Sequence, residues 1–357
     1  MSFQNLPNEL QKAIQPSLTL LKLCNISIFH EKIGWRYFMT PCIITILISL
    51  SVGMTQIFKG ELKLVELAYA VSIYVVAIQV TMKAIVVTLN KKEIRSIIVE
   101  LGESWRNTGL TEAQINNKNL LLGKLEFCCA IVYRMTQFGS WLYILAPLVE
   151  TVFRIFVLDQ DFKLIFPFYC SFPYEPTKNW FVYLATYVFE AHTMIHFAYG
   201  YLGTDFLTII LCTCITTKMI LLQEDLRHAV PDYKLKNDGG NYGSSRNIKM
   251  IIKRHQKLTE LSDRLDNICN KMIFVNLIAA NVTICFFAFS TKVAHSGLDM
   301  GKSFMAVSLT ILYIFTLCYS SELLIESVPF QIINYSFSVV TDLEYIVTPP
   351  HSILRVS

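Results

Sequence analysis

The side chains best placed for chemistry are Glu190, His192 and His196, which share one apolar stretch of the chain. Because His192 and His196 are four residues apart, a helix would place both on one face. A metal site would need a third ligand close by with fitting geometry, and the sequence offers none. We therefore expect no bound metal and interpret the histidines as polar groups that satisfy a neighbouring helix or line a wet cavity.

No enzyme signature accompanies these residues. The sequence contains no GxGxxG, P-loop, HExxH or GxSxG pattern, each of which places backbone or side-chain groups for a particular reaction. We therefore predict that the protein is not an enzyme, with no catalytic residues and no cofactor.

The composition is that of a membrane protein. Of the 357 residues, 53% are hydrophobic and only 16% are charged, which is more apolar surface than one soluble core could hide. The net charge of +4 is small and the basic residues are scattered, so no nucleic-acid partner is expected. Membrane lipid is the expected surrounding.

Six stretches are long and apolar enough to cross the hydrocarbon as helices, which takes about 20 residues each. They cover residues 38–58, 65–89, 127–149, 180–202, 272–289 and 304–324. The chain is thus predicted to be all-α, a polytopic helical membrane protein.

Lysine and arginine are distributed unevenly between the segments that join these stretches. If the N-terminus is cytoplasmic, 21 of the 31 basic residues fall in inner segments and 7 in outer ones. Cytoplasmic loops carry such an excess. We predict a multi-pass protein with a cytoplasmic N-terminus, which is the inverse of a G-protein-coupled receptor.

The fourth and fifth stretches are expected to extend into the cytoplasm. The fourth continues without a break through Thr204 to Leu222, which is longer than any bilayer requires. A glycine-rich segment at 238–245 has the composition of a flexible linker. Beyond it, apolar residues recur at three- and four-residue steps, at Leu258, Leu261, Leu265, Ile268, Met272 and Val275. Such a seam is typical of a local helical hairpin or of an anchor domain where subunits meet.

These features divide the chain into five segments. We expect a cytoplasmic N-terminal segment at 1–37, spans one to four at 38–222, and a cytoplasmic loop with an anchor helix at 223–271. Spans five and six follow at 272–326, and an atypical C-terminal segment occupies 327–357.

Charged side chains inside the spans cost roughly 2.5 to 3.5 kcal/mol each at a helix centre, so each needs a partner or a path to water. Glu66 and Lys83 lie near opposite ends of the second stretch, from which they can reach the interface. Arg134 lies deeper in the third stretch, and we expect it to face the protein interior. Asp205 is its candidate partner.

Aromatic and weakly polar side chains gather at comparable depth in the outer halves of three stretches. Small-molecule sites between helices are mostly apolar with a few polar handles, so a hydrophobic volatile would suit such a place. The candidate ligand-binding residues are Tyr74, Phe138, Trp141, Phe189, His192 and Met194. Ordinary packing against lipid or core is the alternative for each of them.

Two blocks of the sequence resemble insect odorant receptors, those of moths especially. The first runs from residues 165–176 (IFPFYCSFPYEP) through the long fourth stretch to residues 222–228 (LQEDLRH). The second runs from residues 251–258 (IIKRHQKL) into the fifth stretch, with residues 321–326 (SELLIE) ending the sixth. Order and spacing agree with this family over about residues 15–326.

The resemblance implies a seven-helix subunit of an odour-gated, non-selective cation channel in the plasma membrane. It also implies a small hydrophobic odorant as ligand and an obligate odorant co-receptor as partner, in a hetero-oligomer that is a tetramer. The chain lacks the long cytoplasmic insertion and TVVGYLG-like stretch of that co-receptor, so it resembles an odour-tuning subunit.

The C-terminus departs from the family pattern. Residues 328–340 are few for a seventh span and include Pro329 and Asn334, so we expect that span to be incomplete. An insect gustatory receptor and a secondary transporter are the alternatives. The first would carry a TYhhhhhQF-like terminal motif and the second matching broken helices in two halves, and neither is found in the sequence.

Overall fold

The computed structural model describes residues 3–24, 26–29, 48, 49, 52, 53, 55, 59, 64–156, 166, 167, 172, 174–236, 242–293 and 297–327. Within these ranges the chain forms seven α-helices, preceded by one short 3-10 turn at Phe3–Asn5, and no β-strand. The helices are α1 (Asn8–Leu23), α3 (Leu64–Leu89), α4 (Lys91–Glu103), α5 (Glu112–Phe156), α6 (Trp180–Lys236), α7 (Tyr242–Val293) and α8 (Gly297–Ser327). The predicted all-α class is confirmed. The expected first span at 38–58 lies almost wholly outside the described residues, and the expected incomplete seventh span lies outside them entirely.

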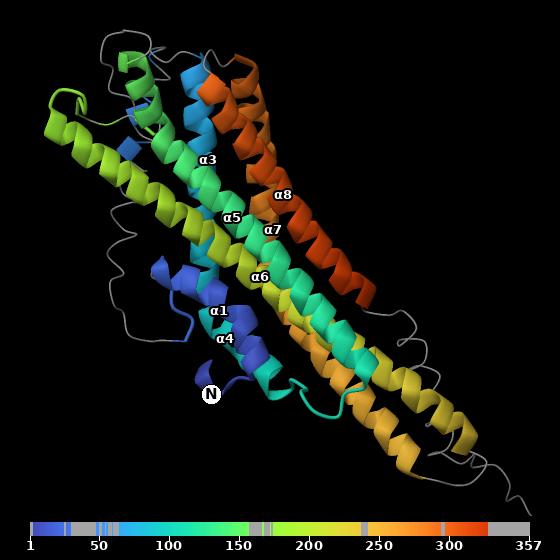
Figure 1. Cartoon of the computed structure of the whole chain (residues 1–357). Coiled ribbons are helices and arrows are strands. Elements are labelled where there is room, and N and C mark those ends of the chain that lie inside the picture. Colours follow the sequence, from blue (N-terminus) through green and yellow to red (C-terminus); the bar gives the residue numbers. More distant parts are fainter. Residues whose placement is uncertain are drawn as a thin grey trace, which may run out of the picture.

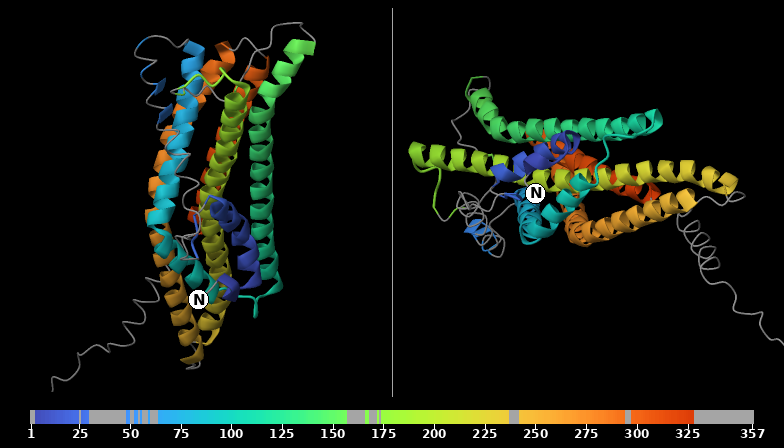
Figure 2. Two further views of the ribbon diagram at one scale, coloured as in Figure 1. Left: turned by 90° about the vertical axis from the view of Figure 1, so that its left-hand side faces the viewer. Right: turned by 90° about the horizontal axis from the view of Figure 1, so that it is seen from below.

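The five long helices run side by side as one elongated bundle (Figure 1). The short helices α1 and α4 lie against the part of the bundle where α3 ends, and the N-terminus is close to them (Figure 2). All the other described helices contact α6, which makes α6 the centre of the structure.

The sequence of α6 explains this central place. Every residue from Leu202 to Met219 is buried, so the helix is enclosed on all sides. A helix that is apolar all round belongs in the interior of a bundle. Four of the five threonines in this stretch donate their hydroxyl hydrogens to carbonyl oxygens one turn earlier, as Thr208 does to Thr204 at 3.2 Å, and so need no outside partner.

Four described helices are long and apolar enough to cross a membrane, by length and composition. The corresponding stretches are Ala70–Leu89, Trp180–Arg227, Lys249–Val293 and Met300–Tyr319. They agree with the second, fourth, fifth and sixth expected spans. The third expected span is also helical, within α5, but Arg134 and Gln137 make it less apolar than the other four.

Helices α6 and α7 are much longer than a bilayer is thick. Their 57 and 52 residues correspond to roughly 85 and 78 Å, against about 30 Å of hydrocarbon. Five of the six residues of the expected seam, Val275 excepted, are buried. The expected linker at 238–245 is wrong for its second half, because α7 already begins at Tyr242 and holds Gly243 in helix.

The N-terminal helix α1 packs closely on α6, which we did not anticipate from the sequence. The Ser17 hydroxyl donates a hydrogen bond to the carbonyl oxygen of Gly203 at 2.9 Å. A Cβ atom at Gly203 would lie 3.0 Å from the Leu21 side chain, so glycine permits this approach. The Cys24 thiol reaches the carbonyl oxygen of His196 at 3.3 Å, within the fourth expected span.

Candidate functional site

A buried ion pair joins α3 to α6 in the middle of the bundle. The Lys83 ammonium donates hydrogen bonds to both carboxylate oxygens of Asp205, at 3.0 and 2.9 Å. The two side chains are 0% and 1% exposed. The same ammonium lies 3.6 Å from the ring centroid of Tyr201, a cation–π contact.

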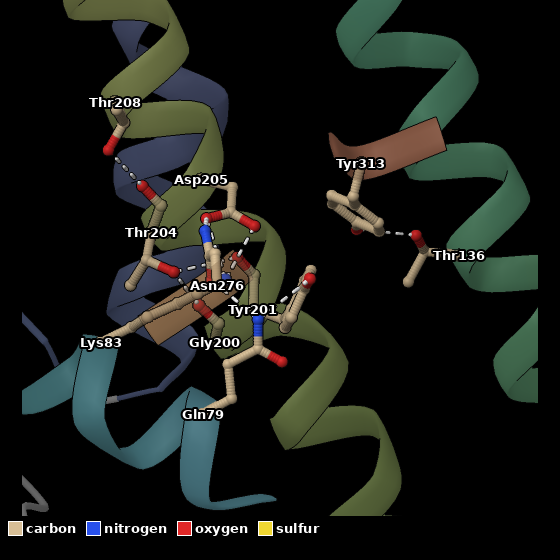
Figure 3. A network of polar contacts seen from close by, with 10 residues as sticks. All are labelled: Gln79, Lys83, Thr136, Gly200, Tyr201, Thr204, Asp205, Thr208, Asn276 and Tyr313. Carbon is tan, nitrogen blue, oxygen red and sulfur yellow. Dashed lines mark hydrogen bonds and ion pairs between the residues drawn. The ribbon is translucent and has the colours of Figure 1, made fainter. Parts of the chain in front are cut away.

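Amide side chains extend this pair to a third helix (Figure 3). The Asn276 amide on α7 donates to Asp205 at 3.4 Å and accepts a hydrogen bond from the Gln79 amide at 2.7 Å. The Gln79 amide also donates to the Tyr201 hydroxyl at 3.4 Å. A buried pair stabilises a fold only if further hydrogen bonds satisfy its remaining polar atoms, and these contacts supply them.

Aromatic contacts carry the network on to α8 and α5. The rings of Tyr201 and Tyr313 meet edge to face, with centroids 4.6 Å apart. The Tyr313 hydroxyl shares a hydrogen bond of 3.0 Å with Thr136 (Figure 3). One polar and aromatic network, centred on Asp205, therefore connects all five long helices.

The expected pairing of Arg134 with Asp205 is wrong. Arg134 is exposed on α5, and Asp205 is bound by Lys83. Lys83 does not reach the membrane interface as expected, because its side chain is fully enclosed. The side chain of Glu66 lies outside the described residues.

The structure does not bring the six candidate ligand-binding residues into one site. Phe138 and Trp141 are 60% and 51% exposed. They lie on the same outer face of α5 as Arg134, since the three positions follow helical spacing. Tyr74 is buried on α3, where its hydroxyl contacts the Ser49 hydroxyl at 2.8 Å.

The other three candidates lie close together on α6. Phe189, His192 and Met194 are all half-buried. The rings of His192 and His196 meet edge to face with centroids 4.2 Å apart. One helical turn or more towards the start of α6, Tyr183 and Tyr187 pack against Ile144 of α5, and the Tyr187 hydroxyl donates to the Ile144 carbonyl oxygen.

The described residues contain no group of three His, Cys, Asp or Glu side chains that could hold a metal ion. The structure does contain a buried network of polar side chains. A half-buried segment with aromatic and histidine side chains lies closer to the start of α6. Such a network can hold helices in one register, and the adjoining segment offers apolar contact with a few polar atoms.

Comparison with known proteins shows where this architecture recurs. The model of the family described as 7tm Odorant receptor matches residues 63–329. Putative odorant receptor 92a of Drosophila melanogaster is 25% identical over 185 residues, which cover 51% of this chain and 43% of that protein. Odorant receptor 85b of the same species is 23% identical over 258 residues, or 70% of this chain and 61% of the relative. The chain thus spans less than two thirds of the length of either relative.

Solved structures share the fold. The insect olfactory receptor OR5 from Machilis hrabei superposes with a TM-score of 0.70 at 15% identity, covering 89% of this chain and 81% of that chain. The structure of the same receptor in complex with eugenol gives a TM-score of 0.65 at 14% identity, over 87% and 79% of the two chains. At these identities the likeness establishes the helical architecture alone.

Proposed function

Since the chain belongs to the 7tm Odorant receptor family, we propose that it is an odour-tuning subunit of an odour-gated, non-selective cation channel. It is a multi-pass membrane receptor and not an enzyme. We further propose that it lies in the plasma membrane with its N-terminus in the cytoplasm, and that it assembles with an odorant co-receptor. The uneven distribution of lysine and arginine supports this orientation. An epitope tag after Met1 would then stay unlabelled on intact cells. Labelling of the tag there would show that the N-terminus is outside and contradict the proposed orientation.

The ligand we propose is a small hydrophobic volatile, bound in the half of the bundle where α6 begins. The observation that carries this proposal is the run of α6 from Ala191 to Tyr199, in which every residue is half-buried. Phe189, His192 and Met194 belong to or adjoin it, and Tyr74 lies at comparable depth on α3. Aromatic rings there would offer an odorant broad apolar contact, and the histidine a single polar handle.

Phe138 and Trp141 remain candidates of a different kind. Because both are exposed on α5, they would line the site only from its open side. Substitutions of Phe138 and Trp141 therefore distinguish two kinds of site. They should change the odour response only if the site reaches the outer face of α5, and not if it is enclosed between α3 and α6.

The position of the proposed site suggests how binding could affect the channel. Tyr201 and Asp205 of the buried network lie on the same helix, about two and a half and three and a half turns beyond His192. Binding must favour one of two conformations if it is to gate a channel. A shift of α6 would change contacts at the ligand and in the network together, since one continuous helix carries both.

The test is to express the full-length chain with the co-receptor and record odour-evoked currents. Phe189→Ala and His192→Ala should raise the half-maximal odour concentration by roughly tenfold, the loss of about one good aromatic contact. Phe181→Ala is the matched control, because Phe181 lies on the same helix but is 77% exposed. Surface expression is measured in parallel.

Two results would count against the proposal. The proposal that the chain is a subunit of an odour-gated channel fails if the protein reaches the cell surface with the co-receptor but a broad panel of odours evokes no current. The site fails if Phe189→Ala and His192→Ala leave every dose–response curve unchanged while currents persist.

A further inference from the structure

A cavity of about 300 Å³ lies far from the proposed odorant site, between the end of α4, α6 and α7. Two helix faces form most of its wall. On α6 the lining positions are Lys218, Leu221, Leu222 and Asp225, and on α7 they are Arg254, Lys257, Leu258 and Leu261. Both sets follow the same three- and four-residue steps, so each helix turns one continuous stripe toward the cavity.

Both stripes combine buried leucines with charged side chains. Each contains a pair of buried leucines. The α6 stripe adds one basic residue, Lys218, and one carboxylate, Asp225, while the α7 stripe adds two basic residues, Arg254 and Lys257. Four basic side chains and two carboxylates line the cavity in total, which leaves a net charge of +2. The basic residues are Arg106, Lys218, Arg254 and Lys257, and the acidic ones are Glu103 and Asp225.

Lys218 is the one of these four basic residues that is buried. The residue is only 9% exposed, yet its ammonium donates hydrogen bonds only to neutral acceptors, the Leu101 carbonyl oxygen at 3.3 Å and the Ser104 hydroxyl. The carbonyl end of α4 offsets part of the charge. Among the described residues, no carboxylate lies within ion-pair distance of it. A buried cation without a counter-charge is costly.

Three cations in this region are paired. Arg106 binds Asp225, and Lys118 binds Glu9 at 2.8 Å. Arg264 contacts both Glu93 and Glu100. Within the described part of the chain, Lys218, Arg254 and Lys257 are the cavity cations without a carboxylate partner.

We propose that this cavity binds a phosphate monoester. Such a group carries close to two negative charges and three acceptor oxygens, which matches the net charge of the lining. Lys218 would meet it from the floor of the cavity, and Arg254 and Lys257 from the exposed rim. The leucines would contact the carbon part of the ester. The ligand is either the headgroup of phosphatidic acid or a soluble ester of the glycerol phosphate type.

The proposal is tested on the purified full-length chain by thermal unfolding and binding. The soluble probe is glycerol phosphate, and the lipid probes are nanodiscs of phosphatidylcholine with phosphatidic acid or with phosphatidylglycerol. Phosphatidylglycerol is anionic but has no monoester. The double variant Arg254→Gln/Lys257→Gln is compared with Lys249→Gln/Lys253→Gln, which removes equal charge from exposed positions of α7 outside the cavity.

We expect saturable binding of the monoester probe, weakened roughly tenfold to a hundredfold in the cavity variant and unchanged in the control, as loss of charge-assisted hydrogen bonds predicts. Lys218→Met should also weaken binding without unfolding the chain, because an apolar side chain replaces a buried charge. Binding of glycerol phosphate at the same affinity as phosphatidic acid identifies a soluble ligand, and preference for phosphatidic acid identifies a lipid.

Three results would overturn the site. One is equal binding of phosphatidylglycerol and phosphatidic acid. Another is equal weakening by the control variant, since either would indicate unspecific attraction of charge. The third is the absence of saturable binding by both glycerol phosphate and phosphatidic acid. Because binding is measured without odour or co-receptor, failure here leaves the proposed receptor function untouched.

Discussion

Two ion pairs of nearly equal length stand in different surroundings. Lys83 and Asp205 approach to 2.9 Å in the middle of the bundle, and Arg264 of α7 and Glu100 of α4 approach to 2.8 Å. The first pair is 0% and 1% exposed, and the second is 26% and 25% exposed. Distance alone therefore does not rank them.

The difference lies in what happens when one partner is lost. A charge left alone in the interior has no water to solvate it, so breaking the pair is far more costly than its attraction suggests. A half-exposed charge is rehydrated instead. The mid-bundle network thus restricts how α3, α6 and α7 can align, while the half-exposed pairs between α4 and α7 contribute modestly to stability.

The largest effect is expected for Lys83→Met. This change leaves the Asp205 carboxylate buried with only Asn276 as a described hydrogen-bond partner. We expect a loss of about 3–5 kcal/mol in the free energy of unfolding, the usual cost of a stranded buried charge. Thermal unfolding of the purified protein in detergent measures it as a large fall in Tm and in folded yield.

The double variant Lys83→Met/Asp205→Leu sharpens the comparison. It removes both charges, so it should recover most of the stability lost in the single variant. If the double variant is as unstable as the sum of the two single variants, the two residues do not act as a pair.

The sequence was sufficient to predict where the helices lie along the chain. It was insufficient to predict which face of each helix points into the bundle. Apolar length alone located α3, α6, α7 and α8, because a membrane span must satisfy its backbone internally. The buried seam that includes Leu261 was predictable because the other face of α7 in this part is polar and exposed.

The orientation of α5 was not predictable for a physical reason. One face carries Val132, which is buried, and another carries Phe138, which is exposed, and large apolar side chains occur on both. In lipid an outward face can be as hydrophobic as an inward one, so periodicity does not tell them apart. Arg134 was therefore assigned to the interior, and Lys83, which makes the contact, was not.

A smaller effect is expected when the half-exposed carboxylates are protonated. Burial tends to raise the pKa of Glu100, but hydrogen bonds from Arg264 and Ser96 outweigh it and lower the pKa below 4.5. The pKa of Glu9 is lowered in the same way, because hydrogen bonds from Lys118 and Trp105 outweigh its burial. Each carboxylate is more acidic in the folded chain, so its contribution to stability is present above pH 4.5 and is lost as the pH falls through the folded pKa.

The measurement is Tm as a function of pH in this acidic range. Glu9→Gln/Glu100→Gln should lower Tm at neutral pH and flatten its decline in acid, since the titrating groups are gone. Glu112→Gln, an exposed carboxylate at the start of α5, should leave the slope unchanged. A decline equally steep in the double variant and the original chain would assign the acid sensitivity to other groups.

The smallest effect is expected for Lys12→Gln, at an ion pair that links α1 to α5 on the surface. The Lys12 ammonium lies 3.3 Å from the Glu126 carboxylate, and the two side chains are 76% and 69% exposed. Water and salt screen such a pair, so its removal should change the free energy of unfolding by well under ~1 kcal/mol and leave Tm nearly unchanged. Raising the salt concentration should affect Lys12→Gln and the original chain alike. A fall in Tm comparable to that of Lys83→Met would mean that exposure does not decide which ion pairs matter in this bundle, and that α1 depends on Lys12 more than on the close packing of Ser17 and Leu21 against Gly203.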